Sequence, residues 1–446
     1  MPKKKTALTI EERLQQALVP AEEQPYEVPE NWVWVRLGAI AEIVTGGTPS
    51  KKHPEYYGGN FPFYKPSDLD QGRLTYDASE YLSEEGKKVS RIIPKNSTAV
   101  CCIGSIGKCG YLMCEGTTNQ QINSAIPKIN SLCLYYYLCT ENFVQNLLSM
   151  ASATTIAIVN KSKMESCAFP LPPLSEQQRI VERIEELFAK LDEAKERLQE
   201  VADSFAVRKA AILHKAFTGE LIGKKIEQLV PLESLVDLIK IGPFGSALHE
   251  SDYIENGIPL VNPKHIVQQH IVPQSKISIS EEKAEELSSY RLKANDIVLG
   301  RRGEMGRCAP VSAREENWIC GTGSMIIRLK EEYDARLYSL ILGSQATVTY
   351  LENSAVGSTL KNLNEKIVRK IPVPQFDIEE QHEIVRLIDD LLAREHKAQQ
   401  ATEQALASID LMKKSILARA FRGELGTNKA SEASALELLK QVLAEN

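Results

Sequence analysis

Residues 174–188 read LSEQQRIVERIEELF, and residues 378–392 read IEEQHEIVRLIDDLL. The Glu-Gln pair and the apolar residues after it therefore recur 204 residues later. A second motif, Ala-Phe-x-Gly-Glu-Leu, stands at 216–221 and again at 420–425, with the same separation. Two ungapped segments that share a start and a stop indicate a duplicated unit, in which a variable domain precedes a long helix.

Apolar residues in both segments follow steps of three and four, which predicts a narrow heptad seam. The expected seam residues are Ile180, Ile184, Leu187, Leu191, Leu198 and Val201 in the first copy and Ile384, Ile388, Leu391, Ile409 and Met412 in the second. Helices of roughly 35 to 40 residues would reach roughly 50–60 Å, beyond the face of one small domain. We expect the two helices to pair antiparallel. The alternative is that each helix packs only on its own domain.

The ends of both helices carry recognisable signals. Ser175 with Gln178, and Asp377 with Glu380, have the spacing of capping boxes. Gly219 and Gly423 are placed to end the helices.

The fold class that this pattern predicts is α+β: two similar, strand-rich mixed domains joined by two long antiparallel helices in a pseudo-two-fold arrangement. Thr9 and Glu12 suggest a capped helix before the first domain, and Leu436, Leu439 and Leu443 suggest a short amphipathic helix in the tail. The expected segments are an N-terminal extension (1–29), a first domain (30–173), a first helix region (174–224), a second domain (225–375), a second helix region (376–426) and a tail (427–446).

The two variable domains share a loose order of motifs while their loops differ. Three pairs of segments correspond: 35–37 with 230–232, 61–63 with 258–260, and 102–108 with 299–307. A shared framework with different loops is expected of two modules that read different targets.

Several loops carry side chains suited to base edges or phosphates. In the first domain the candidates are Thr48, Ser50, Lys51, Lys65, Ser67, Ser105, Lys108, Asn119, Gln120 and Gln121. In the second they are Ser246, Lys264, His265, Arg301, Arg302, Arg307, Thr322, Ser324 and Lys361. For each loop the alternative is an ordinary turn, in which Gly, Pro and Asn only set the backbone.

Charge and composition narrow the function classes. The formal net charge is −6, and residues 30–168 carry 13 Lys and Arg against 12 Asp and Glu. A stand-alone DNA binder is more basic, so partners are expected to supply part of any positive surface. No apolar run approaches the roughly 18 to 20 residues that span a bilayer, and we expect a cytoplasmic protein. The nine cysteines lack zinc-ligand spacing and are expected to be reduced core thiols.

Catalytic motifs are not found in the sequence. There is no GxxxxGK[ST] phosphate loop, no GxSxG nucleophile elbow and no HExxH zinc site. We therefore expect a non-catalytic chain with no metal or cofactor of its own.

These motifs, taken in order, make the chain similar to the specificity subunits of Type I restriction-modification enzymes. The resemblance rests on WVWVRLG at 32–38, GGTPS at 46–50, TNQQ at 118–121, and the proline-rich entry at 170–177 into a helix that ends in Ala-Phe-x-Gly-Glu-Leu. It implies two target recognition domains, each reading half of a split target in double-stranded DNA. It also implies helices that space the halves and dock two modification subunits.

Two further expectations follow from the resemblance. S-adenosylmethionine is expected on the modification (methyltransferase) subunits, and ATP with Mg on restriction subunits. The alternative function is a two-domain scaffold that assembles protein subunits without reading DNA sequence.

Overall fold

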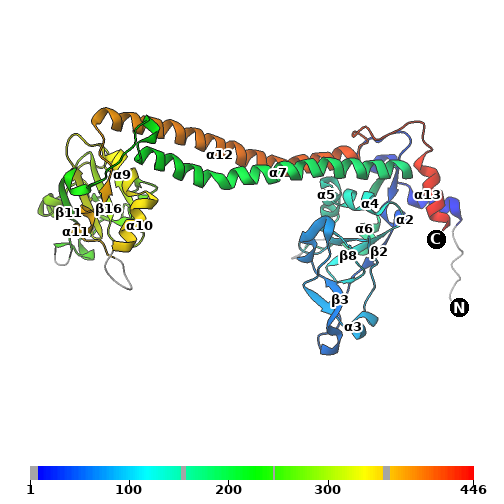
Figure 1. Cartoon of the computed structure of the whole chain (residues 1–446). Helices are drawn as coiled ribbons and strands as arrows, with labels where there is room; N and C mark the ends of the chain where they lie inside the picture. Colours follow the sequence, from blue (N-terminus) through cyan, green and yellow to red (C-terminus); the bar gives the residue numbers. More distant parts are fainter. Residues whose placement is uncertain (1–8, 152–156, 245–246, 355–361, 446) are drawn as a thin grey trace. The chain divides into compact units, whose positions relative to one another are not determined.

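The computed structural model describes residues 9–151, 157–244, 247–354 and 362–445 (Figure 1). The chain forms two compact units, which are Met1–Leu198 with Ala405–Asn446, and Gln199–Gln404. Each unit therefore contains one variable domain, the beginning of one long helix and the end of the other.

Besides its segments of the two long helices, the first unit contains short helices and strands. Its helices are α1 (Ile10–Ala17), α2 (Leu37–Ile40), α3 (Glu84–Lys88), α4 (Ser131–Leu138), α5 (Glu141–Met150), α6 (Lys161–Glu165) and α13 (Ala435–Ala444). Its strands are β1 (Val33–Arg36), β2 (Ala41–Thr45), β3 (Tyr57–Tyr64), β4 (Glu80–Leu82), β5 (Thr98–Cys101), β6 (Cys109–Tyr111), β7 (Thr117–Thr118), β8 (Ile122–Pro127) and β9 (Ala168–Leu171).

The second unit has a matching set. Its helices are α8 (Glu281–Glu286), α9 (Ala335–Leu342), α10 (Gln345–Ser354) and α11 (Glu365–Arg369). Its strands are β10 (Val230–Pro231), β11 (Val236–Ile241), β12 (Ile258–Val261), β13 (Ile266–Val267), β14 (His270–Ile271), β15 (Ser278–Ile279), β16 (Asp296–Gly300), β17 (Cys308–Pro310), β18 (Ile319–Cys320), β19 (Ser324–Leu329) and β20 (Pro372–Val373).

The two domains share one sheet topology, which confirms the predicted fold class of two similar mixed domains. The four-stranded sheet has the order β2-β8-β5-β6 in the first unit and β11-β19-β16-β17 in the second. The three-stranded sheets are β4-β3-β7 and β15-β12-β18, in which β3 pairs parallel with β7 and β12 parallel with β18. The motifs at 61–63 and 258–260 lie on the equivalent strands β3 and β12.

Each four-stranded sheet is buried on both faces, because its central strands alternate between two cores. In β16, Ile297 and Leu299 join the core that contains α9, whereas Val298 joins a smaller core on the other face. In β5, Val100 and Ala99 divide between two cores in the same way. Because consecutive residues of these strands are buried, their sequences do not alternate between apolar and polar residues.

Both long helices form as the heptad pattern predicts. α7 spans Leu174–Phe217 (44 residues) and α12 spans Ile378–Ala420 (43 residues). Gly219 and Gly423, just beyond their ends, have φ angles of 80° and 75°, in the left-handed region that glycine adopts without strain.

The two helix starts differ. Asp377 Oδ1 accepts from Glu380 N at 2.9 Å, and Glu380 Oε2 accepts from Asp377 N at 3.1 Å, so the predicted second capping box is confirmed. The first box is wrong. α7 already begins at Leu174, so Ser175 lies inside the first turn, after a cluster of prolines that holds the preceding chain extended.

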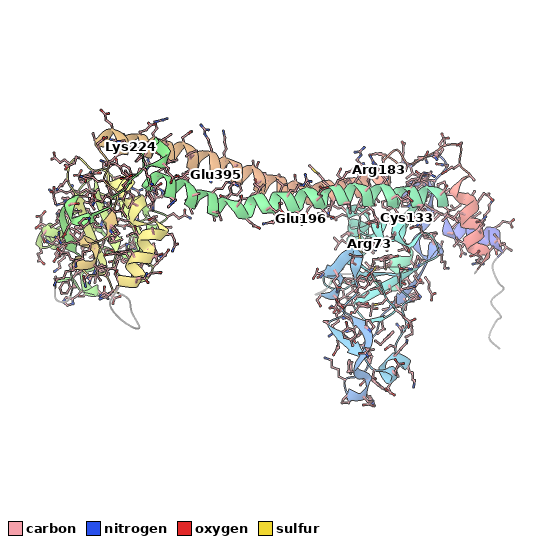
Figure 2. All side chains as sticks on the ribbon, viewed as in Figure 1. Arg73, Cys133, Arg183, Glu196, Lys224 and Glu395 are labelled. Carbon is pink, nitrogen blue, oxygen red and sulfur yellow. The ribbon has the colours of Figure 1, made fainter. Side chains whose placement is uncertain are left out.

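Ion pairs connect the two helices in each unit, and in the first unit they show that the helices run antiparallel. In the first unit Lys195 pairs with Asp410 at 3.7 Å and Asp192 pairs with Lys413, so the partner number falls as the α7 number rises. In the second unit Arg208 Nε lies 2.9 Å from Glu395 Oε2; Glu395 is labelled on α12 in Figure 2.

The predicted seam is apolar mainly where it reaches the domain cores. Ile180 and Ile184 belong to the first core together with Leu417 and Phe421 of the other helix end. Ile384 and Ile388 belong to the second core, and Ile409 is also buried. Four further seam positions are half-buried: Leu187, Leu191, Leu198 and Leu391.

Two seam positions are wrong. Val201 and Met412 are 42% and 49% exposed. Leu198 and Ile409, each three residues away on the same stripe, stay half-buried and buried, so local packing between the helices decides which seam positions are covered.

One glutamine attaches each long helix to its domain. Gln177 Oε1 accepts from Asn130 N at 3.0 Å, at the N-cap of α4. Gln381 Oε1 accepts from Asp334 N at 2.8 Å, at the N-cap of α9. Both glutamines are fully buried. In both copies of the Glu-Gln pair, the glutamine therefore joins the long helix to its domain.

The preceding glutamate has different roles in the two copies. Glu176 is fully buried and accepts from Trp32 Nε1 (2.7 Å), Asn428 Nδ2 (2.8 Å) and Thr427 Oγ1 (3.1 Å). A buried carboxylate is tolerated only with such donors. Glu380 is part of the capping box and pairs with Lys224. The buried network therefore ties the segment after α12 to the start of α7 in the first unit only.

The two chain ends complete the first core. Thr9 and Glu12 form the predicted capping box of α1. Leu439 and Leu443 of α13 are buried in the same core as Ala17 of α1, and Leu436 is half-buried. Residues 9–29 of the N-terminal extension and 427–445 of the tail are therefore structural parts of this unit.

We predict that Gln381→Ala destabilises the second unit by about 2–3 kcal/mol, because it leaves buried backbone groups without partners. Its Nε2 also donates to Glu332 O (2.8 Å) and Phe376 O (3.0 Å). Calorimetric or urea unfolding measures the change. The matched control is Gln399→Ala, an exposed residue of α12 that donates to Glu403. Equal unfolding midpoints for the two variants would contradict the joint.

Candidate nucleic-acid interface

Four loops of the first domain are joined by their backbones, where β2, β3, β5 and β7 end. We call the loops 46–53, 65–67, 102–108 and 119–121 the first loop cluster. Three hydrogen bonds connect them: Gly47 N to Thr118 O (2.8 Å), Asn119 N to Tyr64 O (3.0 Å) and Cys102 N to Gln121 O (2.7 Å). The loops therefore form one surface rather than four separate turns.

The second domain repeats this arrangement where β11, β12, β16 and β18 end. We call the loops 242–244, 262–265, 301–307 and 321–323 the second loop cluster. Two bonds correspond to those named in the first domain: Gly321 N to Val261 O (3.0 Å) and Arg301 N to Gly323 O (2.8 Å). A third, Gly242 N to Ser324 O (2.9 Å), corresponds to Gly46 N to Ile122 O (2.9 Å) in the first domain. The same backbone frame thus presents two different sets of side chains.

Most first-domain candidates lie on the first loop cluster with accessible side chains. Thr48, Ser50, Lys51, Ser67, Ser105 and Gln120 are exposed. Thr48 Oγ1 lies 2.5 Å from Gln120 Oε1, which joins two of the loops. Lys65 and Lys108 are half-buried and paired with Glu80 (2.8 Å) and Asp70 (2.6 Å), so part of the local positive charge is neutralised.

Asn119 is a correction. It is only 8% exposed, its Nδ2 donates to Gln121 Oε1 (3.0 Å), and its Oδ1 accepts from Gln121 N (3.0 Å). Such a side chain holds the turn instead of facing a base. Gln121, half-buried, is its partner, and Gln120 is the exposed amide of this loop.

The candidate residues of the second domain differ more clearly in how exposed their side chains are. Lys264, Arg302 and Thr322 are exposed, and Arg301 and Arg307 are half-buried. Arg307 pairs with Glu304. Ser246 and Lys361 lie outside the described residues.

His265 and Ser324 are also corrections, because both are buried. His265 is 1% exposed, with Nδ1 2.8 Å from Leu260 O and 3.1 Å from Asn262 N. Burial lowers its pKa, so the ring is held neutral inside the domain. Ser324 is fully buried at the start of β19. Neither side chain reaches the surface of the second loop cluster.

Adjacent arginines give the second loop cluster its charge. Arg301 Nε donates to the carbonyl of Leu363 at 3.0 Å. Burial, and then repulsion from Arg302, lower the pKa of Arg301. Two neighbouring guanidinium groups held this way favour an anionic ligand such as a phosphate.

Phe244 is a surface residue that the residue-type reasoning missed. It is 69% exposed, and it follows Gly242 and Pro243 in the second loop cluster. Reasoning restricted to polar side chains passes over a phenyl ring. Its position after β11 is equivalent to that of Thr48 after β2, and this equivalence could have identified Phe244 as a candidate.

The His, Cys, Asp and Glu side chains of the described ranges do not gather as metal ligands. No group of three or more His, Cys, Asp or Glu side chains there could hold a metal ion. All nine cysteines are free, and burial raises the pKa of Cys102 and Cys308 to about 12, so they are poor nucleophiles. Among the described helices, none combines the length and apolarity needed to cross a membrane.

Comparison with known proteins points to one family. The profile of the Type I restriction modification DNA specificity domain matches residues 29–203 and again residues 233–406. The EcoBI specificity subunit of Escherichia coli is 28% identical, over 94% of this chain and 93% of its own length. The EcoKI specificity subunit of Escherichia coli strain K12 is 23% identical, over 94% and 96%.

Solved structures show the same fold. The HsdS subunit from Thermoanaerobacter tengcongensis has a TM-score of 0.62 at 18% identity, covering 90% of this chain and 99% of that one. A structure reported for complex assembly and conformational transition of the type I R-M system has a TM-score of 0.63 at 19% identity, covering 90% and 100%.

We predict that Gly46→Ala disrupts the first loop cluster. A Cβ at Gly46 would lie 2.2 Å from Asn119 O and 2.3 Å from Thr118 O, so the backbone must move. Overpacking of this kind costs about 1–3 kcal/mol. Gly47→Ala is the control, since no atom lies within 4 Å of its Cβ. Hydrogen exchange at 117–122 should rise for the first variant alone; unchanged protection in both would refute the tight contact.

Proposed function

Because this chain belongs to the family of Type I restriction-modification DNA specificity domains, we propose that each loop cluster reads one half of a split DNA target. The chain is a specificity subunit. The observation that carries the proposal is the duplicated backbone frame with different exposed side chains. A shared frame sets the same docking geometry on each half-site, and the side chains choose different bases.

The side chains of the two clusters suit different contacts. Gln120 and Thr48 in the first cluster offer an amide and a hydroxyl, which can bond base edges. Arg302, Lys264 and Thr322 in the second offer cationic and hydroxyl contacts to guanine or phosphate. The corrected residues Asn119, His265 and Ser324 act beneath these surfaces, where they hold the loops.

Both domains are near neutral, with 13 Lys and Arg against 12 Asp and Glu in residues 30–168 and 18 against 19 in residues 225–370. Phosphate contacts supply most of the salt-dependent affinity of DNA-binding proteins, and ion pairs already occupy Lys65 and Lys108. We propose that two modification subunits bind this chain and supply the remaining positive surface. S-adenosylmethionine chemistry would then belong to those subunits, and ATP-driven chemistry with Mg to restriction subunits.

We propose that the two long helices set the distance between the half-sites. Each helix residue advances about 1.5 Å, and one base pair advances about 3.4 Å. The buried joints at Gln177 and Gln381 support this role, because a helix can set a distance only if its attachment to the domain is rigid. The alternative, an assembly scaffold without sequence reading, does not account for two exposed polar loop clusters on one frame.

We predict that replacing residues 30–168 with the matching segment of a relative changes one half of the methylated sequence and leaves the other half intact. The measurement is genome-wide methylation mapping in a host that expresses the chain with its partner subunits. A change in both halves would refute the division into two readers. A complex that assembles but shows no sequence preference against random competitor DNA would favour the scaffold.

A second prediction concerns Arg302. If its guanidinium meets a phosphate, Arg302→Ala should weaken binding to all sequences and reduce the salt slope by about 1. The control is Arg314→Ala, an exposed arginine in the turn that follows β17 at the other end of the sheet. Titration of the assembled complex at several salt concentrations checks this. Identical slopes for the two variants would exclude the contact.

A further inference from the structure

Phe244 combines high exposure with a firmly held backbone. Its side chain is 69% exposed, yet the two residues before it are buried. A Cβ at Gly242 would lie 2.2 Å from Gly321 O, so this strand end and the 321–323 loop are in direct contact. Thr322 Oγ1 donates to Pro243 O at 2.9 Å. The ring is therefore displayed from a fixed base.

The surroundings of Phe244 are cationic. Arg301 N bonds Gly323 O, and Gly242 N bonds Ser324 O, so the arginine loop and the Phe244 turn leave β16 and β11 at the same end of the sheet, on either side of β19. Lys264 is exposed on the loop after β12 in the same cluster. Single exposed apolar residues are common, but a ring that follows an anchored strand end, in one cluster with Arg301, Arg302 and Lys264, favours a polyanion with apolar surfaces to cover.

The first loop cluster has no ring at the position that matches Phe244. The position equivalent to Phe244 is Thr48, since Gly46 N bonds Ile122 O (2.9 Å) as Gly242 N bonds Ser324 O. Thr48 bonds Gln120 within its own cluster. The two clusters therefore differ at one matched position, hydroxyl against phenyl.

We propose that Phe244 inserts as an apolar wedge into the base stack of the half-site that the second domain reads, while the adjacent arginines contact phosphates. This rests on the proposed function. A phenyl ring can replace part of the lost base stacking, and wedges of this kind kink the duplex. Because flexible pyrimidine–purine steps open most easily, Phe244 selects such a step without a hydrogen bond to it.

The test uses the complex of the full chain with its modification subunits, on a duplex that carries its mapped target. 2-Aminopurine is placed at successive positions of the second half-site, leaving out the position of the methylated base, because methyltransferases flip their target base themselves. We expect fluorescence to rise severalfold at one step on binding. Phe244→Thr, the residue of the first domain, should abolish the rise and weaken target binding about tenfold.

Two further variants keep the result specific. Phe244→Leu should retain part of the fluorescence rise, because leucine is also an apolar wedge. Leu229→Thr, at a residue 53% exposed just before β10, should change nothing.

The outcomes separate the inference from the proposed function. A complex with no sequence preference would defeat the proposed function. Sequence-selective binding with no fluorescence rise, or with a rise that survives Phe244→Thr, would defeat the wedge alone. Loss of subunit assembly in Phe244→Thr would assign the ring to a protein contact and overturn the inference.

Discussion

A glutamine side chain at the start of each long helix is the joint on which the arrangement depends. Gln177 and Gln381 are fully buried, and each bonds the backbone at the N-cap of a domain helix. A helix of more than 40 residues transmits position only if its attachment is stiff. The buried side-chain amide bonds through both its oxygen and its nitrogen, and these bonds supply that stiffness. Breaking them would leave several buried polar groups without hydrogen-bond partners.

In the loop clusters, the backbone and the exposed side chains have separate roles. Backbone hydrogen bonds and close glycine contacts fix where the loops stand, and these are matched in the two domains. Backbone bonds do not depend on side-chain identity, so exposed positions such as Thr48 and Phe244 are free to differ. One frame can thereby carry two specificities.

Electrostatics separates the clusters further. In the first, carboxylates pair with Lys65 and Lys108 and lower the field available to phosphates. In the second, burial and then repulsion from Arg302 lower the pKa of Arg301. An anion between them would relieve that repulsion.

The sequence by itself determined the duplication, the two long helices, their glycine ends, the Asp377 capping box and the mixed domain class. These features rest on local periodicity and on signals within one or two turns, which survive without tertiary contacts. Sequence also placed most candidate residues on the loops that do come together.

Only the tertiary structure decided which of those residues are accessible. His265, Ser324 and Asn119 have the right chemistry but are buried by segments distant in sequence. Tertiary packing likewise turned Val201 and Met412 away from the seam, buried Glu176 against the tail, and exposed Phe244. Burial depends on contacts between residues far apart in the chain, and no local pattern encodes it.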